Sequence, residues 1–498
     1  MKKSKPPSSR RAEIHQLYQV YAAGLETLSA RALLMFLHKE QKELTANEEK
    51  AESLIDRFEI NETARENSSM TFEGFLRYME SKECCVFNQA HTSVYQDMDQ
   101  PLTSYFISTS HNTYLTGDQL VGQSSLDAYV SALRKGCRCL EIDCWDGPDM
   151  EPVVYHGHTL TSKILFKDVI TTVGQHAFEV SAYPVILSLE NHCSREQQEV
   201  MAQYLICILG ENLLIAPLDH PTAGDLPSPN KKKVVVAEAL SDLVIYTRSV
   251  KFISFSHSRD NQNCYENTSM EEKKARKLLK ASGSDFVEHN QRFLSRIYPT
   301  GLRMSSSNYN PVEFWNAGSQ LVALNFQSPG LPMDLNDGLF QDNGGCGYVL
   351  KPAVLMSTQM RFDPSSSQHK RKSTSLLLKV ISGSNLPLPR SGKALDPFVR
   401  VEIHGIASDS CRKNTHTVKN NSLSPRWDTD MSFTIRLPEL CLVRFCVRDQ
   451  TGILSSEFVG QYTLPFKSLK KGYRWVPLLS KDGFSLDPAS LFVYISHS

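Results

Sequence analysis

The sequence lacks a long apolar run: no stretch approaches the roughly 18 consecutive apolar residues that a membrane-spanning helix needs. It also lacks an excess of charge of either sign, because Lys+Arg and Asp+Glu both number 54 among 498 residues. We therefore expect no general attraction to nucleic acid, and an anionic partner must be recognised by a local site. The basic start, residues 1–12, runs into an amphipathic segment instead of the apolar core of a secretion signal, so we expect a cytoplasmic protein.

The composition present is that of a globular protein, with 41% hydrophobic residues and a length that suits three or four domains. Twelve cysteines are scattered along the chain, several of them in strand-like runs such as residues 136–144. We expect them to be reduced and buried thiols. Disulfide bonds or a zinc site are the less favoured alternative.

The segment 13–90 shows the apolar spacing of four short amphipathic helices. Apolar residues recur at helical intervals around positions 14–20, 33–37, 54–58 and 72–76. The loops within the two helix pairs, around 22–33 and 59–72, lack the D-x-[DN]-x-[DN]-G pattern and the terminal Glu that calcium binding requires. A structural EF-hand-like lobe is therefore favoured over a working calcium sensor.

From position 105 the pattern changes to short apolar runs that end in polar residues and precede helical stretches. The runs cover residues 105–112, 139–143, 152–156, 184–190, 318–326 and 347–350. Strand alternating with helix predicts parallel β-structure of the α/β class, here a TIM-like barrel. A turn-rich basic break at 226–233 divides this region.

A polar linker at 365–374 ends the α/β region. Beyond it, alternating runs at 376–381, 398–403 and 443–447 are separated by turn-rich loops. This spacing is typical of an all-β sandwich. The sequence thus predicts a multidomain chain in which a helical lobe, an α/β barrel and a β-sandwich follow one another.

Four oxygen donors are expected at the rim of the barrel. Glu141 and Asp143 are spaced i, i+2 on one strand, so both carboxylates project to one face. Asn112 and Glu190 follow other strands. Such a set suits Ca²⁺ better than zinc. Alone, each carboxylate is as well explained by a helix cap or an Arg pair, but four such groups at strand ends favour a metal site.

Two histidines, His111 and His156, end further strands beside these donors. Imidazole suits proton transfer near neutral pH. A lone histidine is more often a core residue, whereas two beside a cation point to phosphoryl chemistry.

Several long motifs, taken together, resemble one family. They are Ser110-His-Asn-Thr-Tyr114, Gly136-Cys-Arg-Cys-Leu-Glu-Ile-Asp-Cys-Trp-Asp-Gly147, Val154-Tyr-His-Gly157, Pro184-Val-Ile-Leu-Ser-Leu-Glu-Asn-His192, Ala239-Leu-Ser-Asp-Leu-Val-Ile-Tyr246, Ser307-Asn-Tyr-Asn-Pro311 and Asp342-Asn-Gly-Gly-Cys-Gly-Tyr348. They resemble the X and Y catalytic halves of eukaryotic phosphoinositide-specific phospholipase C, delta or zeta type. The resemblance extends through the EF-hand-like lobe and a carboxy-terminal C2-like sandwich.

The resemblance implies the following domain bounds: a basic tail at 1–12, an EF-hand-like lobe at 13–90, the X half at 96–229, a shortened join at 230–238, the Y half at 239–356, a linker at 357–374 and a C2 domain at 375–498. It implies a monomer that acts on phosphoinositide lipids in a membrane surface. It also implies peripheral association with a cytoplasmic membrane, with entry to the nucleus left open.

The resemblance also implies roles for the site residues. Asn112, Glu141, Asp143 and Glu190 would hold Ca²⁺. His111 would steady the transition state, His156 would act as general acid and then base, and Glu141 would deprotonate the inositol 2-hydroxyl.

Further positions match those that contact the lipid in the family. Ser269, Arg296 and Tyr298 would grip the inositol ring and its 4-phosphate, although a surface ion pair and a core aromatic also explain the last two. Leu120, His158, Leu160 and Leu302 would form a membrane-dipping rim, and Asp396 and Asp449 would fall in C2 calcium loops. Thr451 stands where the family often has Asp, so the sandwich is expected either to dock by basic surface or to act as scaffold.

The chain departs from the family between residues 229 and 234, where only Asn230-Lys-Lys-Lys233 intervenes. The family has a strand and two phosphate-binding lysines there, so the barrel is expected to be one strand short. An amino-terminal pleckstrin-like domain is expected to be missing as well.

Three hypotheses follow. The first is an active calcium-dependent phosphodiesterase for phosphatidylinositol 4,5-bisphosphate. The second is an impaired isoform that binds lipid without efficient turnover. The third is a different metal phosphodiesterase on the same barrel.

Overall fold

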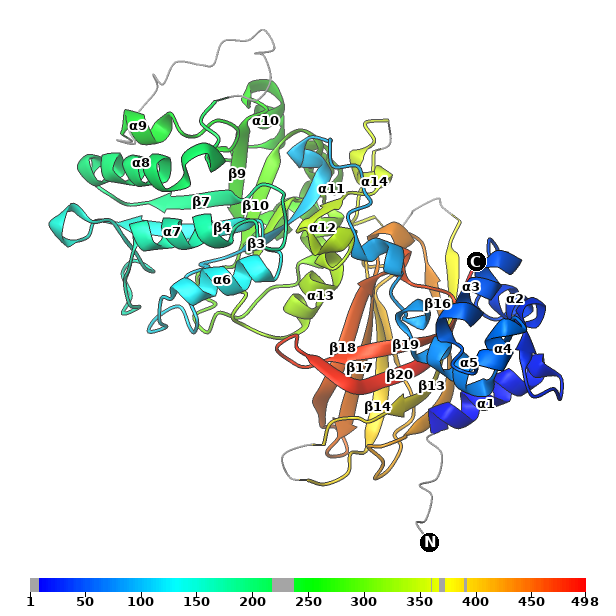
Figure 1. Cartoon of the computed structure of the whole chain (residues 1–498). Helices are drawn as coiled ribbons and strands as arrows, with labels where there is room; N and C mark the ends of the chain where they lie inside the picture. The colour runs from blue at the N-terminus through cyan, green and yellow to red at the C-terminus, as the bar shows by residue number, and fades with distance from the viewer. Residues whose placement is uncertain (1–8, 217–236, 360, 367–371, 389–391) are drawn as a thin grey trace. The chain divides into compact units, whose positions relative to one another are not determined.

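The computed structural model describes residues 9–216, 237–359, 361–366, 372–388 and 392–498. They form two compact units, one made of the helical lobe with the sandwich and the other made of residues 94–366. Figure 1 shows the course of the chain through both units. In the described part of the chain, no helix is both long and apolar enough to cross a membrane.

The amino-terminal lobe contains the four predicted helices and one additional short helix. They are α1 (Ser9–Ala22), α2 (Ala30–Lys39), α3 (Glu48–Phe58), α4 (Glu62–Glu66) and α5 (Phe72–Glu80). Ser29, Asn47, Asn61 and Thr71 cap α2 to α5 through their side-chain oxygens, which satisfies free amides of the first turn. The loops pair through β1 (Leu28–Ser29) and β2 (Ser69–Met70).

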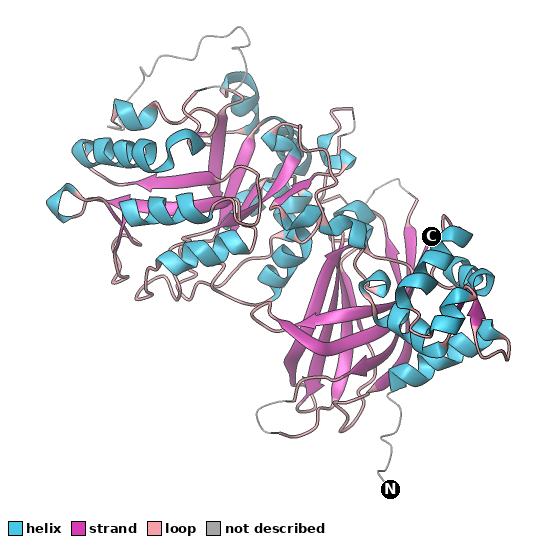
Figure 2. Ribbon diagram, viewed as in Figure 1, coloured by secondary structure: helices cyan, strands magenta, loops and turns pink. Residues whose placement is uncertain are grey.

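The sandwich contains eight antiparallel strands. They are β13 (Thr374–Ser384), β14 (Pro397–His404), β15 (Cys411–Asn414), β16 (Arg426–Ile435), β17 (Leu442–Gln450), β18 (Ser456–Pro465), β19 (Gly472–Leu479) and β20 (Ser485–His497). Their order is β15-β14-β17-β18-β19-β20-β13-β16, and Figure 2 shows these strands in magenta. The predicted all-β region is therefore confirmed.

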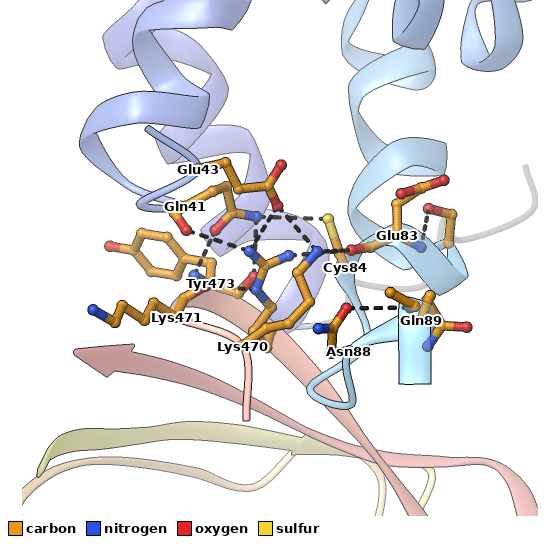
Figure 3. A network of polar contacts seen from close by, with 12 residues as sticks. Gln41, Glu43, Glu83, Cys84, Asn88, Gln89, Lys470, Lys471 and Tyr473 are labelled. Atoms are coloured by element: carbon orange, nitrogen blue, oxygen red, sulfur yellow. Dashed lines mark hydrogen bonds and ion pairs between the residues drawn. The ribbon is translucent and has the colours of Figure 1, made fainter. Parts of the chain in front are cut away.

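A buried arginine joins the helical lobe to the sandwich. Arg474 on β19 is fully buried and lies 3.0 Å from the Glu43 carboxylate. Its guanidinium also donates to the backbone carbonyls of Lys471, Glu83 and Gln41. Figure 3 shows this network, in which Lys470 reaches the same Glu43 carboxylate at 3.0 Å. A buried cation persists only where such acceptors surround it.

The second unit is built on a parallel sheet. Its strands are β3 (Tyr105–Ser110), β4 (Cys139–Trp145), β7 (Ile186–Asn191), β8 (Arg248–Val250), β9 (Glu266–Glu271), β10 (Leu294–Tyr298) and β11 (Leu321–Leu324). They run parallel in the order β7-β4-β3-β11-β10-β9-β8. Parallel order with helical connections is the arrangement of a TIM-like barrel.

Helices cover the parallel sheet. The longer ones are α6 (Leu126–Arg134), α7 (Phe166–His176), α8 (Arg195–Leu209), α11 (Glu272–Arg292) and α13 (Leu331–Phe340), and the short ones are α9 (Glu238–Ser241), α10 (Phe255–Asn261), α12 (Val312–Asn316) and α14 (Ala353–Met356). In Figure 1, α6, α7 and α8 lie side by side along β4 and β7. Leu140, Ile142 and Met201 belong to the apolar core between these helices and the sheet.

The barrel does not close among the described residues. The parallel strands end at β7 on one side and at β8 on the other, and no described strand joins them. This is the place where the sequence predicts a missing strand. Of the predicted join at 230–238, residues 230–236 lie outside the described residues, and Glu238 begins α9.

Two predicted barrel strands are different elements in the structure. Residues 152–156 form only β5 (Val153–Val154), which is antiparallel to β4 and to β6 (Ile164–Leu165). Residues 347–350 form β12 (Tyr348–Leu350), which is antiparallel to β3. Apolar runs of this length predict a strand but not its direction, which long-range pairing decides. The twelve cysteines all lie in the described part and are free thiols; nine are buried as predicted, whereas Cys207, Cys264 and Cys411 are exposed.

Candidate active site

Polar side chains from several strand ends surround one cavity of about 1070 Å³ in the second unit. The predicted residues that line it are His111, Asn112, Glu141, Asp143, His156, Glu190, Ser269, Arg296 and Tyr298. Because parallel strands present their carboxyl ends at one rim, residues nearly 190 positions apart meet there. The structure thus brings together all nine residues of the predicted catalytic, metal and substrate sets.

Three carboxylates form a cluster at this rim. Glu141 and Asp143 lie on β4, and the parallel register of β4 and β7 places Glu190 opposite Asp143. One oxygen from each carboxylate lies within 4.8 Å of the others. Glu141 and Asp143 are buried, whereas Glu190 is exposed. Such a cluster is electrostatically unfavourable unless a cation or a proton offsets the charge.

Within the described part of the chain, the buried carboxylate of Asp143 has a hydrogen-bond partner at only one of its two oxygens. Its Oδ2 accepts a 2.5 Å hydrogen bond from the Tyr114 hydroxyl, but its buried Oδ1 has no partner among the described residues. Burial, followed by the charges of Glu141 and Glu190, raises the pKa of Asp143 well above its ordinary value. A buried carboxylate oxygen without a partner, beside two further carboxylates, fits a hard cation such as Ca²⁺.

Glu141 is held as a carboxylate by its neighbours. Burial alone would raise its pKa, but the Arg296 guanidinium at 2.7 Å and His111 outweigh burial and lower the pKa of Glu141. Its Oε2 also accepts a 2.7 Å hydrogen bond from the backbone amide of Asn112. Glu141 therefore keeps a negative charge inside a buried site.

Asn112 has a backbone conformation that aims its side chain into the cavity. Its φ is 42°, in the left-handed region that Asn tolerates better than most residues. Its Nδ2 donates a 2.7 Å hydrogen bond to Gln119 Oε1. The amide nitrogen is thereby occupied, and the Oδ1 atom is left as an oxygen donor.

His111 is fixed by a second amide. Its Nδ1 lies 2.9 Å from Asn325 Oδ1, and because this oxygen can only accept, Nδ1 carries the proton. Burial lowers the pKa of His111. The ring is therefore neutral at neutral pH in the ligand-free protein, and Nε2 is left for a ligand.

His156 is oriented in the same manner by a backbone carbonyl. Its Nδ1 donates a 2.7 Å hydrogen bond to the carbonyl of Gln119. The Nε2 atom is consequently the nitrogen available for proton transfer. His156 lies on the loop after β5, not at the end of a parallel strand as the sequence suggested.

Three orienting residues were missed from the sequence: Gln119, Asn325 and Tyr114. Asn325 directly follows β11, so the strand-end argument that found Asn112 and Glu190 also applied to it. Gln119 and Tyr114 lie within the loop after β3, further from the strand end than Asn112. Tyr114 lies in the Ser110–Tyr114 motif, but its role depends on Asp143, which is 29 positions away in the chain.

The predicted substrate residues line the cavity, and the four predicted rim residues are not among its lining residues. Arg296 pairs with Glu141 and lies 5.8 Å from the ring centre of Tyr298, while Ser269 is exposed. Leu160 and Leu302 are 83% and 71% exposed. The Leu160 amide donates to the carbonyl of Leu120, which is itself exposed, and the ring of His158 packs on Trp145.

The predicted C2 calcium residues lie together in the other unit. The Asp396 amide donates a 2.7 Å hydrogen bond to Asp449 Oδ1. The Asp396 carboxylate pairs with Lys419 Nζ at 2.8 Å and accepts from the Asn420 amide. A lysine already neutralises one of the two carboxylates, so the assignment of a calcium site here stays a prediction.

Comparisons with protein families assign the chain to one class. The phosphatidylinositol-specific phospholipase C X domain matches residues 98–238, and the Y domain matches residues 240–354. The EF-hand-like domain of phosphoinositide-specific phospholipase C matches residues 8–89, and a C2 domain matches residues 374–478. The chain therefore belongs to the phosphoinositide-specific phospholipase C family, in agreement with the motifs in its sequence.

Individual relatives place it near two branches of that family. It is 46% identical to human 1-phosphatidylinositol 4,5-bisphosphate phosphodiesterase delta-4, over 98% of this chain and 72% of the relative. It is 47% identical to the human zeta-1 enzyme, over 98% of this chain and 88% of the relative. The crystal structure of S. officinalis PLC21 matches with a TM-score of 0.88 and 35% identity, over 98% of this chain and 68% of that one.

The delta-4 alignment extends over 549 residues, which is more than the 498 residues of this chain. The relative thus carries residues inside the matched span that have no counterpart here.

Proposed function

We propose that this chain is a calcium-dependent phospholipase C that hydrolyses phosphatidylinositol 4,5-bisphosphate to diacylglycerol and inositol 1,4,5-trisphosphate through a cyclic phosphate. The observation that carries the proposal is the carboxylate cluster with its partnerless Asp143 oxygen, beside two oriented imidazoles in one cavity. The names of the delta and zeta relatives supply the substrate.

In this proposal Asn112, Glu141, Asp143 and Glu190 would hold Ca²⁺, which would supply positive charge to offset that of the phosphodiester and of the ionising inositol 2-hydroxyl. Glu141, the carboxylate whose pKa is lowered, takes the proton of that hydroxyl. His156 gives a proton from Nε2 to the leaving diacylglycerol oxygen and takes one from water when the cyclic phosphate opens. The Gln119 carbonyl keeps the His156 ring in position for both transfers.

His111 stabilises charge on the phosphoryl oxygens. With Nδ1 bound to Asn325, the Nε2 atom donates a hydrogen bond only in the imidazolium form. An anionic phosphate beside the ring favours that form, because an opposite charge stabilises the protonated state. The interaction is then stronger with the charged transition state than with the free enzyme.

Arg296, Ser269 and Tyr298 contact the inositol ring and its 4-phosphate in the proposal. Arg296 exchanges part of its pairing with Glu141 for the phosphate, which its planar fork of donors suits. The exposed Leu120, Leu160 and Leu302 meet the lipid layer, where each buried leucine contributes about 1.5–3 kcal/mol. The protein acts as a monomer on a cytoplasmic membrane surface.

The test measures release of inositol phosphates from vesicles of phosphatidylinositol and of its 4,5-bisphosphate while Ca²⁺ is titrated. We expect Ca²⁺-dependent turnover of the bisphosphate, lost by at least about 100-fold in His156→Ala. His176→Ala is the matched control, because the His176 side chain pairs with Glu179 and neither residue lines the cavity. Binding of lipid without turnover would refute the proposal in favour of an impaired isoform.

A further inference from the structure

The carboxylate of Glu190 sits on the least supported strand of the site. Its strand, β7, pairs with β4 on one side, and no described strand pairs with its other side. Residues Ile186–Asn191 are half-buried or exposed, whereas β3 and most of β4 are buried. The Glu190 side chain is 58% exposed, against 6% for Glu141. Glu190 therefore needs another contact to keep it facing the other two carboxylates.

His192 supplies that contact. Its Nε2 lies 2.8 Å from Glu190 Oε1 and donates to it, because a carboxylate oxygen only accepts. The backbone amide of His192 donates 2.8 Å to the carbonyl of Cys144 on β4. The histidine thus ties the end of the edge strand to the strand that carries the other two carboxylates.

The His192 ring is held in turn by Trp145, the last residue of β4. The two rings are stacked, with centroids 4.0 Å apart and an angle of 12° between their planes. Other faces of the indole contact Tyr155 and His158, which flank His156. A stacked pair of this kind gains stabilisation beyond the area it buries.

Gly157 leaves space for the Trp145 indole because it has no side chain. A Cβ atom added at Gly157 would lie 1.9 Å from the Trp145 ring, closer than any real contact. Only glycine at this position lets the loop that carries His156 approach the ring. The indole therefore contacts both the His156 loop and the residue that holds Glu190.

We propose that His192 and Trp145 are positioning residues for the calcium site: the stacked rings hold the Glu190 carboxylate of an edge strand against Glu141 and Asp143. The inference rests on the proposed function only for the identity of the ion. His192 acts through Glu190, and Trp145 acts through His192. Neither residue is assigned a place in the catalytic steps.

The test measures binding of Ca²⁺ alone to the full chain by titration calorimetry without lipid, with Glu190→Gln to identify the signal of this site. His192→Phe keeps a ring on Trp145 but removes the donor, and we expect about tenfold weaker binding. His192→Gln restores an N–H donor and should recover part of the loss. Trp145→Leu should weaken binding, while Trp145→Phe should keep most of it.

Turnover assays separate positioning from a general structural effect. We expect His192→Phe to raise the Ca²⁺ concentration for half-maximal activity, with kcat at saturating Ca²⁺ within about twofold of the parent. The matched control is His176→Phe, which removes the 2.6 Å pair between His176, the last residue of α7, and Glu179, and should change neither quantity.

Unchanged or tighter Ca²⁺ binding in His192→Phe would overturn the inference. A fall in kcat without a change in Ca²⁺ affinity would overturn it as well. If the parent binds Ca²⁺ but turns over no phosphoinositide, the proposed function fails while the positioning role stands.

Discussion

Replacing Asp143 with Asn should stabilise the ion-free protein and abolish its response to calcium. The substitution keeps an oxygen that accepts from the Tyr114 hydroxyl and removes one of three clustered negative charges. At 4.8 Å and an effective dielectric constant of about 20, each pair of like charges costs about 3.5 kcal/mol. Arg296 offsets Glu141 and solvent screens Glu190, so we expect a net gain of about 1–2 kcal/mol.

The pH dependence of this gain has a definite sign. The pKa of Asp143 is raised in the folded protein, so the folded state binds the proton more tightly than the unfolded state. Proton binding at Asp143 therefore adds to the free energy of unfolding. The addition is fully present below the pKa of Asp in the unfolded chain, about 3.9, and is lost as the pH rises toward the pKa in the folded protein. The stability difference between Asp143→Asn and the parent should therefore be larger at pH 7.5 than at pH 5.

Thermal unfolding in EDTA measures the predicted gain in stability, and thermal unfolding in Ca²⁺ measures the predicted loss of the response to calcium. At a Ca²⁺ concentration of about 100 times Kd, the parent should gain about 2.7 kcal/mol, and Asp143→Asn should gain little. Asp260→Asn, an exposed carboxylate on α10, should behave as the parent in both media. A variant less stable than the parent in EDTA, or one that keeps the calcium shift, would refute the reasoning.

Three more predictions concern other parts of the molecule. Arg474→Met should destabilise the unit of helical lobe and sandwich by about 3–5 kcal/mol in chemical unfolding, because the half-buried Glu43 carboxylate and three backbone carbonyls lose their cationic donor. Arg57→Met, which breaks a solvent-exposed pair, should cost at most about 1 kcal/mol. Asn325→Ala should lower kcat about 10- to 100-fold without changing the Ca²⁺ requirement, because the His111 ring loses its partner. Burial lowers the pKa of His289 to about 4, so stability should fall by about 3 kcal/mol between pH 7 and pH 4, and His289→Phe should remove that part of the pH dependence.

A specific result would contradict each of these three predictions. Equal losses in Arg474→Met and Arg57→Met would mean that burial of the network adds nothing. A raised Ca²⁺ requirement in Asn325→Ala would mean that Asn325 supports the metal ligands instead of His111. Identical pH profiles for His289→Phe and the parent would mean that His289 protonates freely in the folded protein.

The sequence by itself determined the kinds of element and the chemistry of the site. Residue spacing predicted the helices of the lobe, four of the seven parallel strands and the sandwich, because helix and strand periods are local properties of the chain. It missed β8, β9 and β10. The i, i+2 spacing of Glu141 and Asp143 placed both carboxylates on one face, since side chains alternate along any strand. The motifs predicted the family that the comparisons then showed.

Only the tertiary structure decided how these pieces support one another. The antiparallel direction of β5 and β12 depends on strand pairing, which local sequence does not contain. The partners of His111 and His156 come from other loops and strands, so their hydrogen bonds exist only after the rim has assembled. The partnerless oxygen of Asp143 likewise follows from burial, which is a property of the fold and not of the residue.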